Sequence, residues 1–73
     1  MSSIQYMGLS EINGPLIALD HVKDVGYDEV AQIRLNDGTE RVGRIVEISG
    51  EKAVLQVFEG TKGLSLKNTK TKF

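Results

Sequence analysis

One stretch of the sequence has a glycine spacing that phosphate-binding loops use. Gly60-Thr61-Lys62-Gly63 places a threonine and a lysine between two glycines. A P-loop requires Gly-x4-Gly-Lys-Ser/Thr and a following helix, because the amides at the helix N-terminus hold the phosphates. No second Gly-Lys pair follows here, and residues 64–73 begin with the apolar–polar alternation of a strand. The GXXG loop of a KH domain also fits these four residues, but that loop joins two helices and none is indicated. We therefore interpret the stretch as a turn.

The other reactive side chains form no catalytic or metal-binding motif. The chain has no cysteine, and its one histidine, His21, lies among charged residues. The ten carboxylates are spread over the expected turns and outer faces, so no acid/base pair stands out. A hydrolytic triad needs a serine paired with a histidine, and no local motif surrounds Ser10, Ser49 or Ser65. We expect no catalytic residue, no metal and no cofactor in this chain.

Length and charge distribution point to a module that works with a partner. Seventy-three residues suffice for one domain, and a core of this size without a disulfide or metal supplies about 3–5 kcal/mol at most. Residues 1–59 carry ten acids and five bases, whereas residues 60–73 carry four lysines and no acid. A basic end suits a nucleic-acid arm or a contact with a neighbouring domain. Few aromatic side chains are available to stack on bases, which disfavours the nucleic-acid alternative.

Targeting signals are missing from the sequence. The first basic residue is Lys23, so no positively charged region precedes an apolar stretch as in a signal peptide. The longest uncharged run at the start is residues 1–10, far below the roughly 20 residues of a membrane span. We expect a cytoplasmic chain without direct membrane insertion.

Turn residues recur at short intervals and predict an all-β fold. Asp37-Gly38 is a strong hairpin signal because glycine accepts positive φ. Further breaks occur at Gly14-Pro15, at Gly50, and at Gly60 and Gly63. They separate six strand-length segments, namely 4–12, 16–22, 29–35, 41–49, 52–59 and 64–73. Short, regularly spaced strands without helical periodicity favour a small barrel or sandwich. The acidic stretch 20–28 is expected to form a longer loop or one loose turn.

Period-two alternation assigns the strand side chains to an inner and an outer face. The expected interior comprises Ile33, Leu35, Val46, Ile48, Leu55 and Val57. Val42 is placed on the same face as Val46. Three apolar residues fall on the opposite face and are candidates for contacts with neighbouring subunits: Ile45, Val54 and Phe58. A β-bulge would exchange these faces.

Three pieces of the sequence together resemble one known family. They are "GLSEINGPL" at 8–16, "VGRIVE" at 42–47 and "KAVLQVFEGTKGLSLKNTKTKF" at 52–73. They are similar to the N-terminal β-barrel of the B subunit of the V-type/A-type ATPases (ATP synthases). The catalytic A subunit has a related barrel, but "LKNT" at 66–69 is more similar to the B subunit.

The resemblance implies a fold and a place in a larger machine. It implies a closed six-stranded antiparallel-type β-barrel over residues 1–73, forming the N-terminal part of a noncatalytic, regulatory subunit. Its partners would be catalytic A subunits, alternating with B in a hexameric ring, and peripheral-stalk subunits. Nucleotide would bind only in a following domain, and the complex would couple ATP synthesis or hydrolysis to hydrogen ion or other ion transport. The chain would then be cytoplasmic and peripheral to the membrane.

A free-standing binding module is the alternative to this assembly role. A small barrel of the OB or SH3 kind would bind nucleic acid or peptide through Lys67, Lys70 and Lys72 at the basic end. The assembly interpretation instead predicts no nucleic-acid partner.

Overall fold

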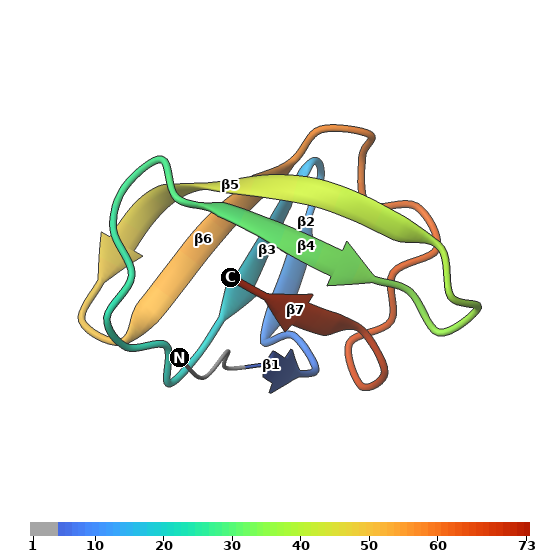
Figure 1. Ribbon diagram of the computed structural model, residues 1–73, viewed down its shortest axis with the longest axis horizontal. Coiled ribbons are helices and arrows are strands. Elements are labelled where there is room, and N and C mark those ends of the chain that lie inside the picture. The colour runs from blue at the N-terminus through green and yellow to red at the C-terminus, as the bar shows by residue number, and fades with distance from the viewer. Residues whose placement is uncertain (1–4) are drawn as a thin grey trace.

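The structure, a computed structural model, describes residues 5–73 and contains only strands and turns in that range. The strands are β1 (Gln5–Met7), β2 (Glu11–Asn13), β3 (Leu16–Leu19), β4 (Val30–Arg34), β5 (Glu40–Ser49), β6 (Lys52–Val57) and β7 (Lys70–Lys72). All paired strands are antiparallel and form one sheet in the order β1-β7-β4-β5-β6-β3-β2. The sheet curls around an interior (Figure 1). The predicted all-β barrel fold is confirmed.

The first predicted strand is interrupted and closes the two edges of the sheet. β1 pairs with β7 at one edge, and β2 pairs with β3 at the other. The connecting residues hydrogen-bond to both sides, with Gly8 N donating to Thr69 O at 2.7 Å and Ser10 N to Ala18 O at 2.8 Å. Gly8 adopts φ +84°, a left-handed conformation that glycine enters without a Cβ penalty. One segment counted as a single strand therefore becomes two.

The other expected turns lie where the sequence placed them. Positive φ is found at Gly14, Gly38, Gly50, Gly60 and Gly63. At the β4–β5 hairpin, Thr39 N donates to Asp37 Oδ1 at 2.9 Å. This hydrogen bond lowers the pKa of Asp37 below its usual value because it stabilises the carboxylate. Residues 20–29 form the expected long loop between β3 and β4 and insert Val22, which is buried, into the core.

The predicted strand over residues 64–73 is wrong in its first half. Only Lys70–Lys72 form a strand, and the preceding residues form turns. Ser65 Oγ accepts the amides of Lys67 and Asn68, each at 3.2 Å, while Ser65 N donates to Thr69 Oγ1 at 2.8 Å. Hydroxyl side chains that satisfy nearby backbone groups compete with strand pairing. The alternation of two leucines here was therefore a coincidence of spacing.

The core lies inside the curled sheet and corrects two sequence assignments. Its members are Leu9, Ile17, Leu19, Val22, Ala31, Ile33, Ile45, Ala53, Leu55 and Val57. Burial of Ile33, Leu35, Leu55 and Val57 is confirmed, and Ile48 is partly buried against the core. Val46 was expected inside but is 38% exposed, and Ile45 was expected outside but is 0% exposed. A register shift between Ile45 and Glu47 in the β5–β6 ladder exchanges the faces at this point, so alternation that is right for Ile48 gives the wrong face for Val46 and Ile45.

Candidate interaction surface on the outer face of the barrel

The glycine loop at residues 60–63 is a structural turn. The Arg41 Nη1 atom donates to the carbonyl oxygens of Gly60 at 3.1 Å and of Lys62 at 2.6 Å. The loop thus directs carbonyl oxygens toward the Arg41 guanidinium. A phosphate-binding loop would instead present a row of backbone amides. Turns rather than a helix follow residues 60–63. These carbonyl oxygens carry partial negative charge and would repel a phosphate. The interpretation as a turn is confirmed.

The polar residues considered for chemistry take part in separate local contacts. The His21 Nδ1 atom lies 3.8 Å from Glu51 Oε1, and the His21 side chain is 88% exposed. The Ser10 hydroxyl donates to Ala18 O at 3.0 Å, and the Ser65 hydroxyl holds the turn before β7. Within residues 5–73, no group of three or more His, Asp or Glu side chains is arranged to hold a metal ion. Also in this range, no helix is long and apolar enough to cross a membrane.

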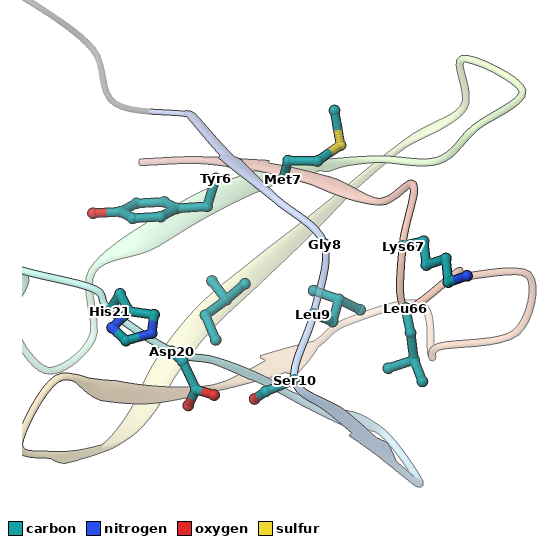
Figure 2. Close-up of a pocket in the computed structure, with 10 residues that line it drawn as sticks. Tyr6, Met7, Gly8, Leu9, Ser10, Asp20, His21, Leu66 and Lys67 are labelled. Carbon is teal, nitrogen blue, oxygen red and sulfur yellow. The ribbon is translucent and has the colours of Figure 1, made fainter.

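One hollow opens beside β1 and measures about 410 Å³. Its lining residues are Tyr6, Met7, Gly8, Leu9, Ser10, Leu19, Asp20, His21, Leu66 and Lys67. Figure 2 shows Asp20 and His21 on one side of this hollow and Lys67 on the other. The charged groups therefore do not converge on one point, and the hollow offers no catalytic arrangement.

Two of the three predicted contact residues do lie on the outer face of β6. Ala53, Leu55 and Val57 point into the core, so the intervening side chains point outward. Val54 is partly exposed, and Phe58, directly after the strand, is 56% exposed. Ile45 does not join them because it lies on the inner face of β5 with Gly43, and as a fully buried side chain it cannot supply a surface contact. That Val54 and Phe58 contact a neighbouring subunit stays a prediction.

Phe58 lies beside exposed apolar side chains of the neighbouring strands β5 and β4. Phe58 N donates to Val42 O at 3.0 Å, which places the ring beside β5. The Arg44 guanidinium lies 6.0 Å from the ring centroid, and Val30 is the cross-strand partner of Arg44. Val30 and Val42 are 54% and 42% exposed. We call Val30, Val42 and Phe58, with Arg44 between them, the Phe58 patch.

The sequence assigned Val42 to the wrong face of its strand. In the structure Gly43 and Ile45 point inward, which leaves Val42 and Arg44 outside. A Cβ at Gly43 would lie 2.9 Å from Ile33 Cδ1 and 3.2 Å from the carbonyl oxygen of Gln56, so this inner position is crowded. A glycine inside a strand signals such a close approach, and this signal could have indicated the correct face.

Val54 lies in a second, smaller hollow on the same outer surface. This hollow measures about 170 Å³ and is lined by Glu11, Asn13, Leu16, Ile17, Ala18, Glu47, Lys52 and Val54. Val54 is the cross-strand partner of both Ala18 and Glu47, so the apolar floor lies beside a carboxylate. We call this feature the Val54 hollow.

Comparison with known proteins agrees with the fold. The family model of the ATP synthase alpha/beta family, β-barrel domain, matches residues 9–73. A V-type ATP synthase beta chain from Halothermothrix orenii is 45% identical over all 73 residues. The chain spans 16% of the length of that relative. The resemblance found in the sequence is confirmed.

Proposed function

The chain belongs to the ATP synthase alpha/beta family through its β-barrel domain, and from this premise we propose that it serves in assembly. It acts as the N-terminal barrel of the noncatalytic, regulatory B subunit of a rotary V/A-type ATP synthase. Its role is to hold subunits together, and it carries out no catalysis itself. The observation that carries this proposal is the Phe58 patch, an exposed apolar area of the kind that marks protein contacts.

The proposed partners follow from the same premise. The barrel contacts catalytic A subunits that alternate with B in a hexameric ring, and it lies near the peripheral stalk. Nucleotide binds in another domain of the full-length protein, and the complex couples ATP synthesis or hydrolysis to ion transport. The protein is then cytoplasmic and peripheral to the membrane. The V-type ATP synthase relative supports this placement by its sequence identity over the whole chain.

The binding-module alternative finds less support in the arrangement of the basic end. Lys67 lies at the hollow beside β1, whereas Lys70 and Lys72 lie on β7. The neighbouring aromatic rings of Tyr6 and Phe73 pack on each other at 5.9 Å and against the core. Rings used in this way are not free to stack on bases. Binding of single-stranded nucleic acid by the basic end at physiological salt would favour this alternative.

Changing Phe58 to lysine should weaken assembly without unfolding the barrel. The ring is 56% exposed, so its loss costs little stability, whereas a lysine in a desolvated subunit contact is unfavourable. We expect the affinity of the full-length subunit for its ATP synthase partners to fall about tenfold or more. Native mass spectrometry of the reconstituted complex measures this.

The matched control for this variant is Leu66→Lys. Leu66 is also exposed and apolar, at 50%, but lies in the turn before β7, outside the Phe58 patch. We expect normal assembly from this control. Equal assembly of Phe58→Lys and wild type would remove the main support for a contact at this patch.

A further inference from the structure

One outer face of the barrel carries excess positive charge. Arg34 of β4 lies opposite Lys70 of β7 in the ladder, and Lys72, opposite Gln32, lies two pairs further along. Arg34 Nη2 bonds to Glu40 Oε2 at 2.7 Å. Neither lysine has a carboxylate partner within 4.0 Å in the described part of the chain, residues 5–73. These three cations and one carboxylate, with Gln5 and Gln32, line a shallow depression that we call the basic face.

The Val54 hollow has the opposite charge balance. Two carboxylates, Glu11 and Glu47, and one ammonium group, Lys52, surround it. Lys52 Nζ lies 3.8 Å from Glu11 Oε1. Glu47 is exposed and has no cationic partner within 4.0 Å among residues 5–73. The hollow thus combines an apolar floor with one carboxylate that is free to meet a cation.

The two features lie on opposite sides of the barrel. β4 and β5 separate β7 from β6 in the sheet order, and β6 continues into β3. Figure 1 shows β7 and β4 in front of β3 and β6. Both sets of side chains point outward, so they face away from each other. Opposed faces of opposite charge let one barrel contact a different neighbouring barrel on each side, and complementary charge selects those contacts.

We infer that the Val54 hollow receives a lysine-bearing face of the neighbouring barrel, equivalent to the basic face of this chain. The aliphatic stem of a lysine covers the floor formed by Leu16, Ala18 and Val54, while its ammonium group pairs with Glu47. On the opposite side, Lys70 and Lys72 pair with carboxylates of the other neighbour. This inference rests on the proposed function, since it needs barrels that meet as neighbours. It adds the direction of the contact and the charges that select it.

Charge reversal on each face tests the inference in the full-length subunit. Glu47→Lys should weaken association with the partner subunits about tenfold or more, because like charges then meet at the contact. Lys72→Glu should have the same effect from the opposite face. Glu47→Gln removes only the attraction, so it should weaken association less and reduce its dependence on salt. Sedimentation of the reconstituted subunits at several salt concentrations gives these affinities.

Controls separate this inference from the proposed function. Asp20→Lys and Lys62→Glu change exposed charges outside both features and should leave assembly unchanged. Circular dichroism confirms that each variant is folded. Assembly that withstands Glu47→Lys and Lys72→Glu overturns the inference while the proposed function stands. A wild-type subunit that never joins ATP synthase partners overturns both.

Discussion

Replacing Ile45 with alanine is expected to lower the free energy of unfolding by about 2–5 kcal/mol. The side chain is 0% exposed and lies in the core, where removal of methyl and methylene groups leaves a cavity. The neighbouring substitution Val46→Ala should cost less than about 1 kcal/mol, because Val46 is 38% exposed. Urea denaturation followed by circular dichroism measures both values.

This pair of variants tests the bulge in β5 directly. Without the register shift between Ile45 and Glu47, alternation counted back from Ile48, which packs against the core, would place Val46 inside and Ile45 outside. The two substitutions would then exchange their effects. A larger loss for Val46→Ala than for Ile45→Ala would show that the shifted β5–β6 register is wrong.

Replacing Gly8 with alanine should destabilise the closure of the barrel by about 1–3 kcal/mol. Gly8 has φ +84°, and a Cβ there would lie 3.0 Å from the carbonyl oxygen of Leu66. Its amide also donates to Thr69 O, so any movement that relieves the crowding weakens the link between β1 and the turn before β7. Thermal unfolding of the variant measures the loss.

Gly14→Ala is the matched control for this substitution. Gly14 also has positive φ, at +60°, but a Cβ there meets no atom within 4 Å. The substitution should therefore lower the free energy of unfolding only by the penalty of the left-handed conformation for alanine, about 1 kcal/mol. If both variants lose the same stability, the close approach of Leu66 to Gly8 contributes nothing to the closure.

The sequence predicted most of the fold because turns and alternation are local signals. Asp37-Gly38 and the other turn glycines were read correctly, since positive φ is a property of single residues. Alternation also placed Ile33 and Leu55 inside correctly. The bulge after Ile45 was not predictable in this way, because it depends on how β5 pairs with β6 rather than on β5 alone.

The candidate surface was predicted only in part. Phe58 and Val54 follow from alternation along one regular strand, β6. Val30 and Val42 join Phe58 only through the pairing of β4, β5 and the end of β6, which a single sequence does not specify. The opposed charges were visible as an acidic body and a basic end. Their positions on opposite faces became apparent only from the strand order.

The most direct test of the central proposal measures the mass of the native protein and whether it migrates with an ATPase complex. An antibody against this segment can be used on native gels and denaturing blots of the source cells. We predict a product several times larger than 8.0 kDa that migrates with a membrane-associated ATPase complex. This size agrees with the related V-type ATP synthase beta chain, of which the present chain spans only 16% of the length. A native product of only 8.0 kDa that migrates apart from any ATPase would contradict the account, and binding of nucleic acid or peptide by the basic end would then take its place.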